Sequence, residues 1–156
     1  MSGIAGTLMV VDAMGVLLRG PAGSGKSDTA LSLIGRGQQL VADDAVILRQ
    51  HDHVLFGRAP AAGHGWLYLR GPGLLNVRQC FGAASVAEEA SIDLVVDLTD
   101  RAQTDQAAGS WETTRIMNTA CPRLALAPQR PIADLITAAV AVLAQTIAAK
   151  RPVACA

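Results

Sequence analysis

The chain has 156 residues, of which 51% are hydrophobic and 17% are charged. This length and composition predict one globular domain with a real core, and they argue against intrinsic disorder. The 13 basic residues balance the 13 acidic ones. Without a basic excess or stripe, no nucleic-acid partner is expected.

The cysteines and the N-terminus indicate the compartment in which the protein works. The sequence has three cysteines, Cys80, Cys121 and Cys155, with no close pair among them. This spacing supports neither a disulfide framework nor a zinc site, and it favours the reducing cytoplasm. The N-terminus shows no basic stretch followed by an apolar run, so a signal peptide is not expected.

Apolar periodicity predicts short strands that alternate with helices. Strands are expected, in chain order, at residues 7–11, 16–19, 40–42, 45–49, 54–56, 66–69, 92–98 and 123–126, the last at an edge of its sheet. A helix is expected at 26–36, with Gly37 as its C-cap. A second helix is expected at 132–149, where Asp134 and Gln145 interrupt an apolar run. Packing on the core is the favoured role of this helix, and a membrane span is the less favoured one.

The two strands at 45–49 and 54–56 are expected to form a hairpin. Their connection contains His51, Asp52 and His53, which together resemble a metal-binding trio. Polar, solvated residues are expected in a hairpin turn. We therefore interpret the three as turn residues rather than as metal ligands.

Two further segments are expected to be irregular. Residues 70–76 begin with Arg70 and contain two glycines and a proline. They form either a mobile loop that brings Arg70 near phosphate or an ordinary surface turn. Residues 101–111 are polar and rich in alanine and glycine, which predicts an exposed loop or a short helix.

A phosphate-binding motif follows the second predicted strand. The pattern G-x-x-x-x-G-K-[ST] is matched without a mismatch by Gly20, Pro21, Ala22, Gly23, Ser24, Gly25, Lys26 and Ser27. Glycines allow backbone N–H groups to curl around phosphates, and the helix that begins here directs its positive end at the anion. Lys26 would contact the β- and γ-phosphate oxygens, and the Ser27 hydroxyl would ligate Mg²⁺. The sequence therefore predicts a site for Mg-ATP.

A phosphate loop also needs an acid near the metal or the nucleophile, and two candidates are present. Asp43 and Asp44 end the short strand that follows the predicted helix, whereas Asp97 ends the apolar strand at 92–98, as in a Walker B segment. Adjacent carboxylates repel each other unless a cation compensates them. An acid is also common in the turn after a strand, so the residues alone leave the choice open.

Three segments, taken in order, resemble the bacterial HPr kinase/phosphorylase family. They are residues 20–31, the phosphate loop; residues 41–44, which read V-A-D-D as in the family; and residues 70–77, which resemble the end of its signature E-I-R-G-x-G-I-I-N-V. After Val77 the resemblance is loose. It implies an α/β P-loop domain with a mixed central sheet and flanking helices over residues 1–156, in the short form that contains only the catalytic domain.

The resemblance implies a cytoplasmic, ATP- and Mg²⁺-dependent kinase that phosphorylates a serine of HPr, the phosphocarrier of the sugar phosphotransferase system. Family members also catalyse the reverse phosphorolysis and assemble as hexamers. By resemblance Asp44 is the general base, while Asp43 and Ser27 lie at the metal. Lys26 stabilises the charge on the phosphates, and Arg70 orients phosphate or the incoming protein.

The chain departs from the family pattern at two positions. The family's functional histidine falls on Ala5, and the metal-binding glutamate of its signature falls on Tyr68. A tyrosine phenol is neutral near pH 7 and cannot replace a carboxylate on Mg²⁺. These departures predict that nucleotide binding survives and that catalysis, above all phosphorolysis, is weakened. The alternatives are a nucleotide-binding regulatory module and a small-molecule kinase.

Overall fold

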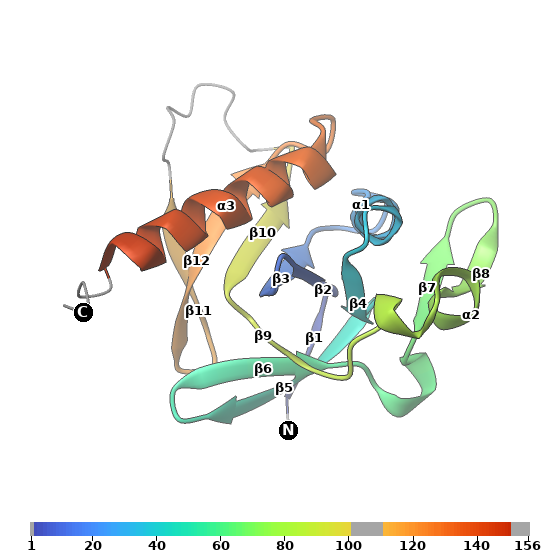
Figure 1. The fold of residues 1–156 in the computed structure, drawn as a ribbon, viewed down its shortest axis with the longest axis horizontal. Helices are drawn as coiled ribbons and strands as arrows, with labels where there is room; N and C mark the ends of the chain where they lie inside the picture. The colour runs from blue at the N-terminus through green and yellow to red at the C-terminus, as the bar shows by residue number, and fades with distance from the viewer. Residues whose placement is uncertain (1, 101–110, 151–156) are drawn as a thin grey trace, which may run out of the picture.

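A six-stranded mixed sheet forms the centre of the molecule (Figure 1). The computed structural model describes residues 2–100 and 111–150. The strands of the sheet run in the order β11 (Glu112–Ile116), β12 (Thr119–Leu126), β10 (Leu94–Leu98), β3 (Met14–Arg19), β2 (Thr7–Val11) and β4 (Gln39–Ala42). β10 pairs in parallel with both β3 and β12, and the outer pairs are antiparallel. The mixed sheet predicted from the family resemblance is therefore confirmed.

A second, antiparallel sheet packs against one face of the first. Its four strands run in the order β1 (Ser2–Ala5), β5 (Ala45–His51), β6 (Val54–Arg58) and β9 (Ala90–Ser91). The turn between β5 and β6 consists of Asp52 and His53, both with positive φ. Asp52 and His53 thus form the predicted hairpin turn, whereas His51 is the last residue of β5. No group of three or more potential metal ligands occurs in the part of the chain that the structure describes.

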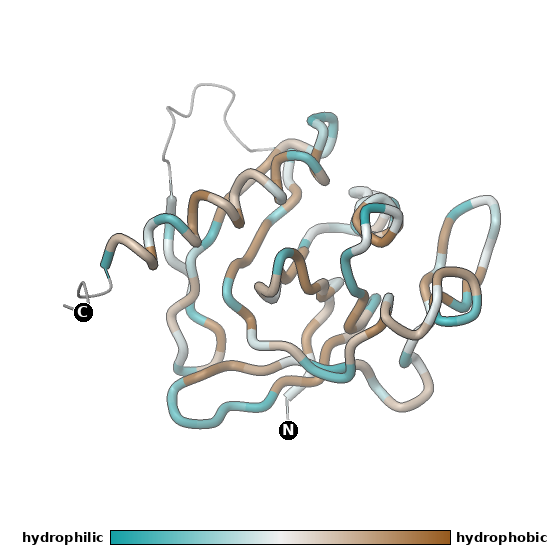
Figure 2. The backbone as a smooth tube through the Cα atoms, viewed as in Figure 1, coloured by the Kyte–Doolittle hydropathy of each residue, from teal (hydrophilic) through white to brown (hydrophobic). Residues whose placement is uncertain are grey.

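The helices α1 (Lys26–Gly35) and α3 (Ile132–Lys150) cover the other face of the large sheet (Figure 1). Successive side chains of a strand point to opposite faces. Leu18 and Val96 accordingly pack with the helices, whereas their neighbours Leu17 and Val95 pack with the small sheet. The brown stretches in Figure 2 follow these central strands, which are apolar on both faces because both faces are covered.

A two-stranded ribbon, β7 (Trp66–Leu69) and β8 (Gly73–Asn76), projects beside α1, and the short helix α2 (Val77–Phe81) follows it. Leu67 and Leu69 are buried on one side of the ribbon. Trp66, Tyr68 and Leu74 are exposed on the other side. The short 3₁₀ segments Ala61–Gly63 and Ala83–Ser85 flank this unit in the chain.

The chain passes between the two sheets at two adjacent corners. Gly6 joins β1 to β2, and Asp43 and Asp44 join β4 to β5. The backbone N–H of Gly6 donates to the carbonyl of Asp44 at 3.1 Å, which ties the corners together. The predicted acid pair thus lies where the sheets meet.

The predicted helices and most predicted strands are confirmed, two predictions are wrong, and two edge strands were missed. β12 is not an edge strand, because the polar strand β11 pairs on its outer side. Residues 70–76 are not all loop, since β8 occupies their second half. β1 and β11 were not predicted from their apolar pattern: both lie at a sheet edge and are mostly exposed, so little periodicity marks them. The predicted segment 101–111 lies outside the described residues, apart from Trp111.

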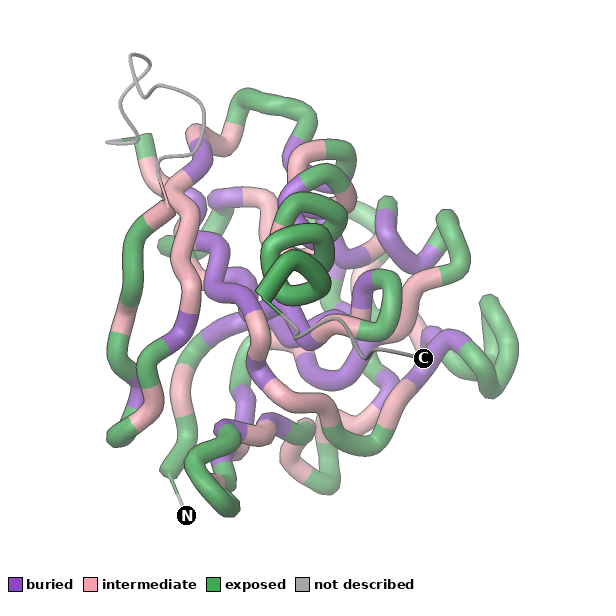
Figure 3. The backbone as a smooth tube through the Cα atoms, turned by 60° about the vertical axis from the view of Figure 1, so that its left-hand side comes forward, coloured by how far each residue is buried: buried purple, intermediate pink, exposed green. Residues whose placement is uncertain are grey.

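Helix α3 is only half covered by the fold. Its first part buries Ile132, Ile136 and Val140, which confirms core packing there. Residues 141–150 are exposed except for Leu143, as Figure 3 shows by the green end of the helix. Among the described residues α3 is the one helix long and apolar enough to cross a membrane, by length and composition alone.

Candidate functional site

The phosphate loop connects the end of β3 to the start of α1, the context that its motif requires. Gly25 caps the helix with φ 94°, in the left-handed region that favours glycine. A Cβ on Gly20 would lie 2.7 Å from the Ser24 Oγ and 2.9 Å from the Leu98 carbonyl oxygen, so the packing there requires glycine. The Lys26 Nζ donates to the carbonyl oxygens of Gly20 and Pro21 at 2.6 and 3.0 Å. The ammonium therefore lies at the loop itself.

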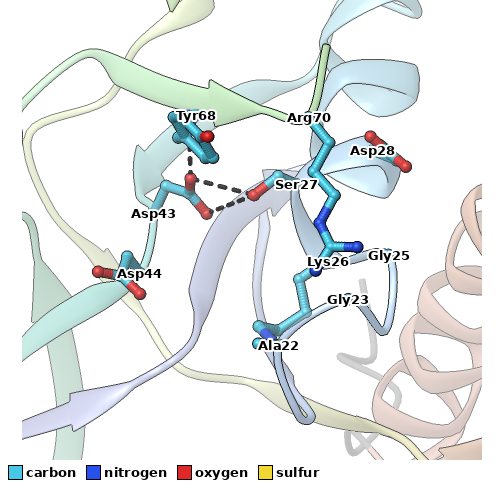
Figure 4. Close-up of a pocket in the computed structure, with 10 residues that line it drawn as sticks. All are labelled: Ala22, Gly23, Gly25, Lys26, Ser27, Asp28, Asp43, Asp44, Tyr68 and Arg70. Atoms are coloured by element: carbon cyan, nitrogen blue, oxygen red, sulfur yellow. Dashed lines mark hydrogen bonds between the residues drawn. The ribbon is translucent and has the colours of Figure 1, made fainter. Parts of the chain in front are cut away.

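Arg70 reaches the phosphate loop from the far end of β7. A Cβ placed on Gly23 would lie 3.1 Å from the Arg70 Nη2. Figure 4 shows the guanidinium beside Gly23, Gly25 and Lys26. Of the two interpretations of residues 70–76, the structure favours the one that brings Arg70 to the phosphate loop. Lys26 and Arg70 thus bring two cationic groups to the phosphate loop.

Asp43 is fixed by hydrogen bonds from three directions. Its carboxylate oxygens accept from the Ser27 hydroxyl at 3.2 and 3.1 Å. The hydroxyl of Thr7, which is fully buried, donates to Oδ1 at 2.8 Å. The backbone N–H of Tyr68 donates to Oδ2 at 3.3 Å. Asp43 thus links the phosphate loop to the start of β2 and to the ribbon.

Asp44 lies beside it in a different setting. Its φ is 70°, which is uncommon for a residue other than glycine. Such conformations cost on the order of 1–3 kcal/mol and cluster at functional sites. The residue is exposed, whereas Asp43 is half-buried. The two neighbouring carboxylates therefore differ in freedom, one being anchored and the other open to solvent.

These residues surround a cavity of about 460 Å³ (Figure 4). It is lined by Ala22, Gly23, Gly25, Lys26, Ser27, Asp28, Asp43, Asp44, Tyr68 and Arg70. A second cavity of about 330 Å³ adjoins it and is lined by Asp43, Asp44, Ala62, Gly63, Trp66, Tyr68 and Leu74. Both cavities share the acid pair and Tyr68. The first contains the phosphate loop together with Lys26 and Arg70, while the second is mostly apolar.

Three predicted loop residues stand outside the first cavity. Gly20 and Pro21 contribute carbonyl oxygens to Lys26. Ser24 is buried, and its hydroxyl has no hydrogen-bond partner among the described residues.

Ala5 ends β1 opposite Ala45, next to the acid pair along β5. The family's histidine position therefore borders the site, although it lies two strands before the phosphate loop.

Asp97, the other candidate acid, is engaged elsewhere. Arg19 donates to its two oxygens at 2.7 and 2.9 Å, and Arg123 donates at 2.5 Å and also pairs with Glu112. Burial alone would raise the pKa of Asp97, but the bonds from both arginines outweigh it and lower the pKa. Asp97 is absent from the residues that line the two cavities. Its carboxylate instead joins three neighbouring strands of the sheet.

Sequence reasoning missed Thr7 and the backbone of Tyr68 as partners of Asp43. A single threonine at the start of an apolar strand is a weak signal, since threonine is common in strands. Only the pairing of β2 with β4 brings Thr7 to the acid corner. The network of Asp97 could be anticipated only from the strand order.

Comparison with known proteins finds one family model and several relatives that match most of the chain. Residues 2–154 match the model of the HPr Serine kinase C-terminal domain family. The chain is 42% identical over 132 residues to an HPr kinase/phosphorylase of Geobacillus kaustophilus, covering 82% of this chain and 42% of that protein. It is 38% identical over 148 residues to one of Clostridium acetobutylicum, covering 88% of this chain and 47% of that protein. The chain thus spans less than half the length of these relatives.

A solved structure shares the fold along almost the whole chain. The HPr(Ser) kinase/phosphatase of Coxiella burnetii superposes with a TM-score of 0.87 at 28% identity. The match covers 96% of this chain and 94% of that one.

Proposed function

The chain belongs to the HPr serine kinase C-terminal domain family, and from that premise we propose that it transfers the γ-phosphoryl group of Mg-ATP to a serine of an HPr-like phosphocarrier protein. The observation that carries the proposal is the contact between the Ser27 hydroxyl and the Asp43 carboxylate. It places an acid directly at the phosphate loop, within one cavity that also holds Lys26, Asp44 and Arg70. Phosphoryl transfer needs this combination of cations, metal ligand and base.

The loop residues have distinct roles in this proposal. Backbone N–H groups of residues 20–27 and the N-terminus of α1 bind the phosphates. Lys26 exchanges the carbonyls of Gly20 and Pro21 for the more strongly attracting phosphate oxygens. Arg70, which already lies against Gly23, stabilises negative charge on the transferred group or orients the acceptor.

The oxygens beside the loop fit a magnesium ion. Mg²⁺ is bound through one or two carboxylates together with phosphates and water, and Ser27 with Asp43 offers a hydroxyl and a carboxylate 3.1 Å apart. The ion would offset the charge between phosphate groups. The bond from Thr7 keeps the Asp43 carboxylate turned toward Ser27. Tyr68 adds only a backbone N–H to this acid.

Asp44 is the proposed general base. It is open to solvent and to both cavities, so an acceptor hydroxyl can approach it while nucleotide fills the first cavity. Asp43 is committed to Ser27 and Thr7 and is less free to take a proton. Asp97 is held by two arginines and is not proposed for this role.

The proposal is tested by incubating the purified chain with Mg-ATP and a purified HPr, and by following phosphoserine on HPr by mass spectrometry. The natural chain is expected to phosphorylate HPr, whereas Lys26→Ala should lose transfer and bind ATP more weakly. A matched control is Lys150→Ala, since Lys150 lies at the exposed end of α3. Unchanged ATP affinity and turnover in Lys26→Ala would refute the role of the phosphate loop.

A regulatory module that binds nucleotide with little catalysis is the second candidate. Ala5 and Tyr68 favour it, because they remove a histidine and a carboxylate that the family resemblance implies. The discriminating result is ATP binding without phosphoserine on HPr. Restoring both groups by Ala5→His with Tyr68→Glu should then raise turnover more than ATP affinity.

The family resemblance supports three further proposals. We propose that the protein is cytoplasmic and assembles as a homo-oligomer, a hexamer. We also propose that its phosphorolysis is slower than its kinase reaction.

A further inference from the structure

Tyr68 is the residue at which the two cavities meet beside the acid pair. It lines the cavity of the phosphate loop and also the second, apolar cavity. Its side chain is 61% exposed, and Figure 4 shows it above Asp43 at the mouth of the first cavity. A free phenol hydroxyl therefore stands at the boundary between the space for phosphate and the space open to an acceptor.

The ribbon holds this side chain toward the site. The Tyr68 N–H donates to Asp43 at 3.3 Å, which fixes the backbone next to the proposed metal ligand. Leu67 and Leu69 point the other way and are buried in the core. Because side chains alternate along a strand, the phenol must lie on the side of the acids. Leu74 stands directly opposite Tyr68 on β8 and is itself exposed, so it leaves the ring open.

We propose that Tyr68 is itself a phosphoryl acceptor, so that the chain phosphorylates its own tyrosine. This inference rests on the proposed function. The phenol oxygen forms a bond to the γ-phosphorus of ATP while the bond from that phosphorus to the ADP oxygen breaks. The phenol proton passes to the Asp44 carboxylate, which lines both of the same cavities. The products are phosphotyrosine at position 68 and ADP.

The modification would limit itself. A phosphate on Tyr68 adds about two negative charges beside Asp43 and Asp44. Like charges at this distance disfavour the entry of a further nucleotide. We therefore expect at most one phosphate per chain and a slower phosphorylation of other acceptors by the modified protein.

The composition of the chain makes the test clean, since Tyr68 is its only tyrosine. The purified chain is incubated with Mg-ATP alone, and the intact mass and the fragment spectra are recorded. One added phosphate located on Tyr68 is expected, with none in Tyr68→Phe, which keeps the ring, and none in Lys26→Ala. Phosphate found only on serine or threonine, or no phosphate, overturns the proposal.

A second measurement does not depend on turnover. Nitration of the single tyrosine is followed by absorbance with and without Mg-ADP. Bound nucleotide should slow nitration at least severalfold in the natural chain and leave Lys26→Ala unaffected. Equal nitration rates with and without Mg-ADP overturn the proposal, because the phenol would then not face the bound phosphates.

A parallel incubation with HPr separates this inference from the proposed function. If HPr acquires phosphoserine while Tyr68 stays unmodified, the self-phosphorylation alone fails. If Tyr68 is modified while HPr is not, the self-phosphorylation stands and the acceptor assignment fails. If neither is modified, both fail.

Discussion

At the scale of single residues, the difference between two neighbouring carboxylates defines the site. Asp43 accepts hydrogen bonds from Thr7, Ser27 and the Tyr68 backbone, whereas Asp44 is exposed at a strained corner. An anchored carboxylate suits a metal, and an exposed one suits a proton acceptor. These surroundings are the reason why we propose different roles for two identical side chains.

Asp44→Asn should reduce phosphoryl transfer by about 10²–10⁴-fold, the range typical of a lost general base. The amide keeps the shape of the side chain, so ATP binding should remain. The measurement is single-turnover transfer to HPr together with ATP affinity. Near-normal transfer in Asp44→Asn, together with a large loss in Asp97→Asn, would move the base to β10.

Thr7→Val should weaken the affinity for Mg²⁺ more than the affinity for ATP. The valine keeps the shape of the buried threonine but removes the hydrogen bond to Asp43. A bond to a charged group contributes about 1.5–3 kcal/mol, so half-maximal transfer should need roughly tenfold more Mg²⁺. Thr7→Ser, which keeps the donor, should restore the natural value. An unchanged Mg²⁺ titration in Thr7→Val would show that Thr7 serves packing only.

At the scale of elements, the end of the parallel pair β3 and β10 carries an ionic row. Arg19, Asp97, Arg123 and Glu112 alternate in charge across neighbouring strands. The row takes the place that a Walker B acid would occupy after an apolar strand. The contacts of Asp97 therefore link three strands of the sheet.

Asp97→Asn should lower the free energy of unfolding near pH 7 by on the order of 1–3 kcal/mol, between the values typical of exposed and buried pairs. The pKa of Asp97 is lowered in the folded chain, so its contribution is present above about pH 4, the ordinary range of aspartate. It is lost as the pH falls through the lower, folded pKa. Urea unfolding of both proteins from pH 7 to pH 3 should therefore show a difference that shrinks toward acid.

The control for this prediction is Asp134→Asn. Asp134 pairs with Arg36 at 2.6 Å, but both side chains are much more exposed than Asp97. Its loss should cost less than about 1 kcal/mol. If both variants lowered the free energy of unfolding equally, the ionic row would not be more stabilising than an exposed ion pair.

The elements differ in how well the sequence predicts them. β2, β3, β10 and the helix α1 could be predicted, because burial on both faces or on one helical face leaves a strong apolar pattern. β11 pairs with β12 at the edge of the sheet and carries mostly polar side chains, so no apolar pattern marks it. The loop Gly20 to Ser27 could be predicted from its motif, whereas the partners of Asp43 depend on strand order.

At the scale of the whole molecule, one close backbone contact between the sheets is at Gly15. A Cβ there would lie 1.5 Å from the Ser91 carbonyl oxygen in β9, a clash with backbone that no side-chain shift relieves. Gly15 and Asp93 also exchange hydrogen bonds at 2.9 and 2.8 Å. This glycine allows the small sheet to close on the large one.

Gly15→Ala should therefore destabilise the fold by at least about 1–3 kcal/mol, as overpacking typically does. Among molecules that remain folded, phosphoryl transfer should fall more than nucleotide binding, because the acid corner depends on both sheets. Gly3→Ala is the control, since its Cβ would lie 3.7 Å from the nearest atom. Thermal unfolding, ATP affinity and transfer are compared. If Gly15→Ala lost nucleotide binding and phosphoryl transfer to the same extent, the acid corner would not depend on the contact between the sheets more than the phosphate loop does.

The bond between Gly6 and the Asp44 carbonyl ties the proposed base to the meeting of the two sheets. The phosphate loop belongs to the large sheet and α1, whereas the corner that presents the acids exists only when β1 and β5 are also in place. A chain caught midway through folding could hold a nucleotide but would have no base beside it. The proposed function therefore implies that a partly folded chain does not transfer phosphate.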